Sequence, residues 1–242
     1  MTGKLGVAER PINRLGVNMN FKKIVYQASW LAASVLTAAS VQAASLSLNT
    51  GVDAGGAVLA EGAADVTWTI SVDGGVTFTT SQVNYAEQIC CGMATVASTA
   101  AWVTDSGVAG SSVTGWGVGS TVFLRTTFDL SAFDLSSTAL SGTWRVADSL
   151  VGIYLNGVEL QGAIDDTWDT DRPIIALAGN PAFNQGLNTV EFRANSGNSR
   201  WDGLWVDATV RGADRFAVPE PTSALLSLAA LGALALTRRR GS

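Results

Sequence analysis

The chain of 242 residues contains no histidine and only two cysteines. Without histidine it can form neither a Ser-His-Asp triad nor a histidine-ligated zinc site, and acid–base catalysis by imidazole is excluded. Charged residues make up only 14% of the chain, and 20 acidic residues stand against 15 basic ones. This acidic balance argues against a nucleic acid partner, because binding to phosphates requires lysine and arginine.

Lysine is missing altogether between residues 44 and 217. In that region seven arginines stand against 18 acidic residues, so its net charge is −11, compared with −5 for the whole chain. The other basic residues lie near the two ends of the chain. We expect the central region to repel DNA and anionic lipid and to attract divalent cations.

Near the N-terminus, three kinds of sequence follow one another. Residues 19–23 include two lysines, residues 24–39 are mostly apolar and uncharged, and small side chains then flank Gln42. This order is typical of a secretory signal peptide, and the apolar run is short for a membrane span. It predicts export through the Sec translocon and cleavage by signal peptidase between Ala43 and Ala44. A core helix is the alternative, although it would not explain the order.

The C-terminal residues also follow an ordered pattern. Two prolines stop any preceding element, and the uncharged, Ala/Leu-rich run 223–237 favours a helix. At roughly 1.5 Å per residue this run spans about 22 Å, which is short of the ~30 Å hydrocarbon core unless flanking residues contribute. The arginines that follow are expected to stay in the cytoplasm, as they would in an ordinary tail anchor. The residues of the pattern are Val218, Pro219, Glu220, Pro221, Arg238, Arg239 and Arg240.

This C-terminal pattern resembles the PEP-CTERM sorting signal: a Pro-Glu-Pro motif, one apolar helix and a terminal basic cluster, here over residues 218–240. The resemblance implies recognition by an exosortase and cleavage near the Pro-Glu-Pro motif. It also implies transient anchoring in the inner membrane, followed by a place at the cell surface or outside the cell. The family is associated with Gram-negative bacteria that make exopolysaccharide.

The region between the two ends has the pattern of a β protein. Residues 66–72 alternate, Asp73-Gly74-Gly75 predicts a turn, and Asn156-Gly157 between two apolar runs predicts a hairpin. No stretch keeps a 3.6-residue apolar period, so we predict an all-β fold, an antiparallel β-sandwich or jelly roll. Strands are predicted over residues 66–72, 76–79, 121–128, 140–146, 151–155, 158–160, 188–193 and 204–210.

The order of the motifs between residues 121 and 212 is more particular. Asp148 precedes the hairpin sequence Tyr154-Leu155-Asn156-Gly157, and the strand sequence of residues 186–192 follows later. This order resembles the galactose-binding-like jelly roll of carbohydrate-binding modules and of many PEP-CTERM proteins. The resemblance implies calcium and sugar sites in some members of the fold. The predicted divisions are an upstream extension (1–18), a signal peptide (19–43), a β-sandwich domain (44–217) and the sorting signal with its transmembrane helix (218–240).

The densest acidic stretch lies in a predicted loop over residues 165–171. Its carboxylates suit Ca²⁺, although the spacing is not that of an EF-hand, and a solvated acidic loop is the alternative. Trp168, at the centre of this loop, could stack on a sugar ring or fold back over the edge of the sandwich. The predicted calcium ligands are Asp165, Asp166, Asp169 and Asp171.

A second loop, residues 195–203, combines amides with Arg200, Trp201 and Asp202. These three residues are predicted to contact a sugar; the alternative is a turn in which Trp201 acts as a flap. Asp148 is expected to order the turn before the strand of Tyr154. Three further tryptophans, Trp68, Trp144 and Trp205, lie in strand patterns and are predicted to pack in the core, whereas the pattern places neither Trp102 nor Trp116.

Cys90 and Cys91 are adjacent in the sequence. Their Cα atoms are about 3.8 Å apart, below the usual disulfide range of roughly 4.4–6.8 Å, so a bridge between them would be strained. Two free thiols would be unusual in the oxidising environment of an exported protein. A vicinal disulfide, two buried thiols and an intermolecular bridge all stay open at this point.

Two functions from different classes are compatible with these features. The preferred hypothesis is an exported, non-catalytic surface protein that binds extracellular polysaccharide or acts in an exopolysaccharide or biofilm matrix. The alternative is a secreted glycosidase or polysaccharide lyase, with Asp166 and Asp171 as the paired carboxylates. A structural matrix protein without a ligand is a third hypothesis. No residue is assigned a catalytic role, and no cofactor other than Ca²⁺ is expected.

Overall fold

A computed structural model describes residues 43–84, 99–105, 114–165, 168–198 and 200–216. Residues Val41–Val218 form one compact unit. The predicted signal peptide apart from Ala43, the sorting signal and both cysteines lie outside the described residues. Among the described residues, no helix is long and apolar enough to cross a membrane.

The described residues form eleven strands, all paired antiparallel, and no helix, which confirms the prediction of an all-β antiparallel fold. The strands are β1 (Ala43–Ser47), β2 (Ala64–Ser71), β3 (Thr79–Val83), β4 (Val103–Thr104), β5 (Thr121–Asp129), β6 (Ala139–Val146), β7 (Ser149–Leu155), β8 (Val158–Gln161), β9 (Arg172–Ala176), β10 (Leu187–Asn195) and β11 (Leu204–Ala213).

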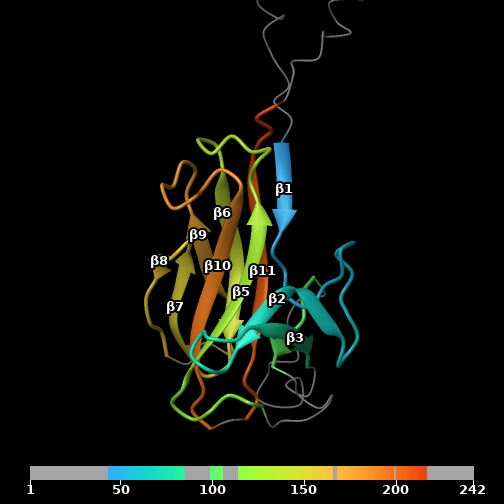
Figure 1. The fold of residues 1–242 in the computed structure, drawn as a ribbon, viewed down its shortest axis with the longest axis vertical. Coiled ribbons are helices and arrows are strands. Elements are labelled where there is room, and N and C mark those ends of the chain that lie inside the picture. Colours follow the sequence, from blue (N-terminus) through green and yellow to red (C-terminus); the bar gives the residue numbers. More distant parts are fainter. Residues whose placement is uncertain (1–42, 85–98, 106–113, 166–167, 199, 217–242) are drawn as a thin grey trace, which may run out of the picture. The chain divides into compact units, whose positions relative to one another are not determined.

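The strands lie in two layers (Figure 1). Strands β8, β7, β10, β5 and β2 pair in that order in one layer, and β9, β6 and β11 pair in the other. Strands β3 and β4 continue the hydrogen bonding from β2 to β11, and β1 also pairs with β11. The alternation of strand residues decides which side chains face inward, because successive side chains point to opposite faces of a sheet. In β5, for example, Val122, Leu124, Thr126 and Phe128 are buried and their neighbours are not.

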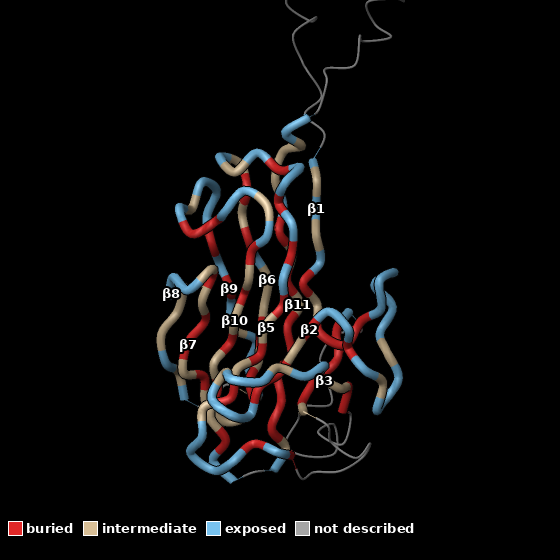
Figure 2. The backbone as a smooth tube through the Cα atoms, viewed as in Figure 1, coloured by how far each residue is buried: buried red, intermediate tan, exposed pale blue. Residues whose placement is uncertain are grey.

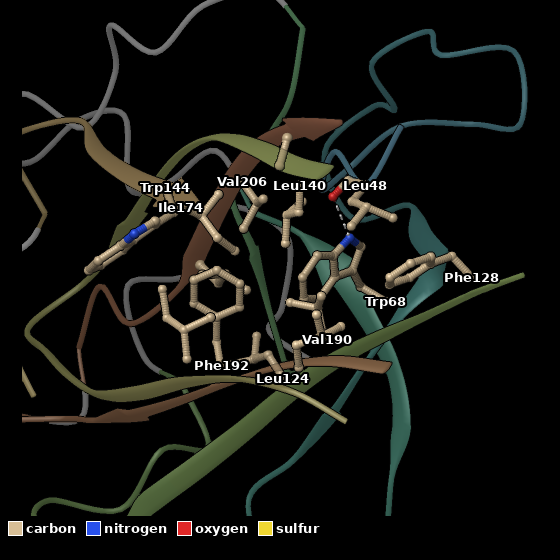
Figure 3. Close-up of a cluster of buried hydrophobic side chains, with 14 of the residues drawn as sticks. Leu48, Trp68, Leu124, Phe128, Leu140, Trp144, Ile174, Val190, Phe192 and Val206 are labelled. Atoms are coloured by element: carbon tan, nitrogen blue, oxygen red, sulfur yellow. Dashed lines mark hydrogen bonds between the residues drawn. The ribbon is translucent and has the colours of Figure 1, made fainter. Parts of the chain in front are cut away.

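Aromatic side chains fill the space between the layers (Figure 3). The ring of Phe192 lies between two indoles, with its centroid 6.0 Å from that of Trp68 and 5.9 Å from that of Trp144. Both indole N–H groups are satisfied: Trp68 Nε1 donates to the carbonyl of Leu48 (3.2 Å) and Trp144 Nε1 to that of Pro173 (3.1 Å). The prediction that these two tryptophans pack in the core is therefore confirmed.

The first hairpin differs from its prediction. We expected a turn at residues 73–75 and a strand over 76–79, but β3 begins at Thr79 and a longer connection precedes it. The carboxylate of Asp73 accepts hydrogen bonds from the backbone N–H groups of Val76 (3.1 Å) and Thr77 (2.9 Å). These bonds hold the backbone in a turn, where it cannot pair with β2.

The two ends of the sandwich are defined by β11, which runs from one to the other (Figure 1). The loop end, lower in Figure 1, comprises the described residues 102–105, 114–120, 147–148, 165, 168–171, 195–198 and 200–203. The exit end, where β1 begins and β11 finishes, comprises residues 130–138, 156–157, 177–186 and 214–216. Exposed residues concentrate in the connections at both ends, while the strands between them are largely buried (Figure 2).

Candidate functional site

The loop end holds both segments that the sequence predicts to contact a ligand. A small cluster of buried side chains lies there, separate from the main core: Ala100, Trp102, Ala147 and Trp205. Trp168, which is half-buried, packs against this cluster. Trp168 therefore folds back onto the sandwich, against Trp205 of β11 and its neighbours. Trp205 is buried as predicted, although it packs outside the main core.

An ion pair holds the same loop in place. Arg145 Nε donates to Asp171 Oδ1 at 2.6 Å, and the Arg145 guanidinium lies 6.0 Å from the centre of the Trp205 ring. Arg145 and Trp205 are register partners on β6 and β11, so their side chains share one face of the sheet. This contact fixes the end of the loop but leaves part of the Trp168 indole exposed.

The second loop is held in an unusual backbone conformation. Trp201 has φ = 54° and Asp148, opposite it, has φ = 64°. Residues other than glycine rarely adopt such angles, and each costs about 1 kcal/mol or more. The Asp148 carboxylate accepts a hydrogen bond from the backbone N–H of Gly197, and the N–H of Ala147 donates to the Gly203 carbonyl at 2.9 Å. Asp148 thus orders its turn, as expected, and also ties that turn to the loop of residues 195–203.

Asp202, which belongs to this loop, is completely buried. Its Oδ2 atom accepts a hydrogen bond from the Thr114 hydroxyl, whereas its Oδ1 atom has no hydrogen-bond partner. Burial raises the pKa of Asp202 to about 6; hydrogen bonds from Thr114 and Ser196 oppose the rise, and the nearby carboxylates of Asp148 and Asp105 add to it. Asp202 therefore supports the loop from inside and has no surface that a sugar could touch. Arg200 is exposed and Trp201 half-exposed on the same loop.

The predicted calcium ligands do not come together within the described residues. Asp165, Asp169 and Asp171 are exposed, and Asp166 lies outside the described residues. Asp171 is already bound by Arg145, and Asp169 accepts a hydrogen bond from the Thr170 hydroxyl at 3.0 Å. In the part of the chain that the structure describes, no three acidic, histidine or cysteine side chains could hold a metal ion. Calcium binding stays a prediction.

The paired carboxylates of the glycosidase hypothesis are not visible as a pair either. Asp166 is not described, and the ion pair with Arg145 engages Asp171. A general acid requires a carboxyl group with a raised pKa, and among the described residues burial raises the pKa of Asp202. The Asp202 carboxyl group, however, is wholly buried. The burial of Asp202 therefore keeps this carboxyl group away from a glycosidic oxygen.

A second aromatic surface, which the sequence reasoning missed, covers the outer face of β7, β10 and β5. The guanidinium of Arg193 lies 4.0 Å from the centre of the Tyr154 ring and 5.1 Å from that of Phe123. Glu191 holds this arginine with an ion pair of 2.8 Å, and all these side chains are half-buried. Their alternate positions on paired strands are the signal that could have revealed the cluster.

Comparison with known proteins identifies one end of the chain. Residues 217–240 match the PEP-CTERM protein-sorting motif, which confirms the predicted sorting signal. The motif implies export, anchoring in a membrane and exosortase as the processing partner. No curated protein matches the sequence.

Several solved structures are similar to the β domain. One is a β-glucuronidase from Ruminococcus gnavus in complex with N1-substituted uronic isofagomine (12% identity, TM-score 0.38, 71% of this chain and 30% of that chain). Another is a family 35 carbohydrate binding module from Clostridium thermocellum (18% identity, TM-score 0.27, 47% of this chain and 78% of that chain). A third is a Stig cyclase from Fischerella sp. TAU (11% identity, TM-score 0.38, 71% of this chain and 100% of that chain). Such low identities and TM-scores assign neither a ligand nor an activity to the chain.

Proposed function

Starting from a chain that is exported and sorted by exosortase, we propose that its β-sandwich binds extracellular polysaccharide through the loop end, without catalysis. The protein then acts at the cell surface or outside the cell, in an exopolysaccharide or biofilm matrix. Sec translocon and signal peptidase process its N-terminus in this proposal, with cleavage between Ala43 and Ala44, the first residues of β1.

One observation carries this proposal. Of the tryptophans that the structure describes, Trp168 and Trp201 alone are partly exposed, and both belong to the loop end. Sugar rings stack their C–H faces on such indoles, and Trp is well suited because it offers a large rigid surface. The other described tryptophans are buried: Trp68, Trp102, Trp116, Trp144 and Trp205.

The polar groups around these two indoles suit sugar hydroxyls. Arg200 and Asn198 are exposed on the same loop as Trp201, and they supply guanidinium donors and an amide. Asn198 Oδ1 already accepts a hydrogen bond from the backbone N–H of Arg200 at 2.7 Å. This bond orders the loop before any ligand arrives. An ordered loop loses less conformational entropy on binding.

Binding is favoured over catalysis because two carboxyl groups of the loop end, those of Asp171 and Asp202, are engaged or buried. Asp171 is paired with Arg145, and Asp202 is buried in its loop. Retaining and inverting glycosidases both need two carboxyl groups on either side of one glycosidic bond. An alternative role for Asp202 is to hold the strained loop that carries Trp201.

The test is retention of the exported protein on immobilised polysaccharides, starting with the exopolysaccharide of the producing cells, with and without EDTA. We expect Trp201→Ala to weaken binding about tenfold, the size of one stacking contact. Trp168→Ala should also weaken it, with its melting temperature recorded because Trp168 packs on a buried cluster. Tyr154→Ala is the matched control, since Tyr154 is half-exposed but lies on the sheet face.

Four results would change the conclusion. Equal loss in the Trp201 and Tyr154 variants would move the site to the sheet face. Loss of binding in EDTA would support the calcium prediction for the loop of residues 165–171. Absence of retention on every polysaccharide would leave a structural matrix protein without a ligand. Release of shorter oligosaccharides during incubation would revive the glycosidase hypothesis.

A further inference from the structure

The exit end holds the chain firmly up to the sorting motif. After β11, the N–H of Arg215 donates to the carbonyl of Ala132 at 2.8 Å, and Asp214 forms an antiparallel bridge with Phe133. The N–H of Asp134 donates to the carbonyl of Ala213 at 2.9 Å. The sorting motif matches from residue 217, so only Phe216 separates these hydrogen bonds from the motif.

Three of the largest exposed apolar side chains of the described residues lie on segments of this same end. Leu177 and Leu187 are each 74% exposed, and Phe216 is 67% exposed. Leu187 follows Gly186, whose carbonyl accepts a hydrogen bond from the N–H of Leu130 (2.8 Å). Two further exposed side chains, Val158 and Ile175, lie near this end. The remaining exposed large apolar side chains of the described residues are all valines.

The three segments that carry this apolar rim are bound to one another. Gln185 Nε2 donates to the carbonyls of Leu130 (2.6 Å) and Ser131 (3.1 Å), which joins the segment before Leu187 to the loop after β5. That loop binds residues 213–215, as described above. The rim made by Leu177, Leu187 and Phe216 is therefore a feature of a rigid end, because its supporting segments are cross-linked by hydrogen bonds.

The spacing along the chain brings this rim near a membrane. The uncharged run of the sorting signal begins at residue 223, seven residues after Phe216. Seven residues span at most about 25 Å even when fully extended. As long as the sorting signal anchors the chain, the exit end therefore stays within about 25 Å of the start of the apolar run.

We propose that the exit end rests on the lipid surface while the precursor is anchored, with Leu177, Leu187 and Phe216 inserted among the headgroups. Moving apolar side chains on a rigid surface from water into the headgroup region of the membrane lowers the free energy. Arg211 and Arg215 are exposed at the same end, and long cationic side chains of this kind can reach phosphate groups. The net charge of −11 in the region 44–217 keeps the remainder of the domain away from an anionic surface.

The test uses the full chain reconstituted in phosphatidylcholine vesicles. A photo-reactive benzophenone amino acid replaces Leu177, Leu187 or Phe216, one at a time. The matched controls are Val118 (65% exposed) and Val76 (82% exposed), because they are exposed apolar residues away from the exit end. After illumination, we expect lipid adducts at the three rim positions and none at the two controls.

Lipid adducts at neither rim nor control positions, or equally at both, would overturn the proposal. In native membranes, adducts to a protein in place of lipid at Leu187 would overturn it as well and would assign the rim to a protein partner. Amide hydrogen exchange of the unsubstituted chain gives a second measurement. We expect slower exchange over residues 177–187 in vesicles than in detergent, and no change over residues 114–120; equal exchange in both media would contradict the contact.

Discussion

At the exit end, the side chain of Asn188 makes four hydrogen bonds, whereas at the loop end the Oδ1 atom of the equally buried Asp202 makes none. The indole N–H groups of Trp116 and Trp205 at the loop end are also buried without a partner. Unsatisfied buried groups are costly, so proteins keep few of them. Their concentration at one end means that buried polar groups are less well satisfied at the loop end than at the exit end.

The carboxyl groups of the two ends differ in the same sense. At the exit end, the Ser131 hydroxyl and backbone N–H both donate to Asp129, which lowers the pKa of that carboxyl group. At the loop end, burial raises the pKa of Asp202 to about 6. The exit end thus favours the charged form of Asp129, and the loop end favours the neutral form of Asp202. The comparison teaches that one sandwich can hold a rigid end and a strained end on the same strands.

The largest expected effect is on the rigid end. Asn188→Ala removes hydrogen bonds to Asn184, Gly186 and Asn156, and we expect it to lower the free energy of unfolding by about 3 kcal/mol. Denaturant unfolding measures this change. The neighbouring Asn184→Ala is the control, because the Asn184 side chain is exposed and only its backbone takes part in these bonds. Similar losses in both variants would show that Asn188 is not the centre of this end.

The second effect has the opposite sign and concerns the loop end. Since the pKa of Asp202 is higher in the folded state than its ordinary value of 3.8, its contribution to stability is present below pH 4. That contribution is lost as the pH rises through about 6. Asp202→Asn removes this loss of stability at high pH, and the amide oxygen of the new side chain can still accept a hydrogen bond from the Thr114 hydroxyl. We expect the variant to gain roughly 1 kcal/mol over the unsubstituted protein at pH 8, after allowance for solvent screening, and little at pH 4.

Thermal unfolding of both proteins between pH 4 and pH 8 measures this difference. The same substitution at the exposed Asp165 serves as the control for a general effect of removing one negative charge. Parallel stability curves for Asp202→Asn and the unsubstituted protein would contradict the raised pKa, and with it the contrast between the two ends.

The smallest effect is a pKa change at the exit end. Ser131→Ala removes one of the two donors to Asp129, so the pKa of that carboxyl group should rise toward its ordinary value of 3.8. On acidification, the variant therefore loses the stability contributed by the charged Asp129 carboxylate at a higher pH than the unsubstituted protein does. Carboxyl NMR titration detects the change. Ser136→Ala, which removes a similar donor from Asp134, should leave the Asp129 pKa unchanged; an equal rise would point to a general charge effect.

Most of the strand framework could be predicted because period-two alternation and turn residues act locally. The Asn156-Gly157 turn is an example: Asn156 has φ = 51°, Gly157 has φ = 82°, and Leu155 pairs with Val158 as a tight hairpin requires. Strand β9 was missed because it is short and contains Pro173, which normally argues against a strand, although an edge position tolerates it.

The site could be predicted only in outline, because its features depend on contacts between distant residues. A tryptophan in a polar loop is visible in the sequence, and Trp168 and Trp201 both keep exposed surface. The burial of Asp202 is not visible, since it depends on Thr114, 88 residues away in the chain. The same holds for Arg145 and Asp171, whose ion pair engages a carboxylate that was predicted to bind calcium.

The pairing of β1 with β11 also constrains how the domain assembles. Ala43 pairs with Ala213, so the first strand of the domain needs the last one as its partner. A contact between residues so far apart in sequence forms slowly, because a long loop must close first. During synthesis and export, residues 43–47 therefore have no strand to pair with until β11 is available. Their Ala- and Ser-rich sequence suits that interval, because a short segment with a single leucine has little tendency to aggregate.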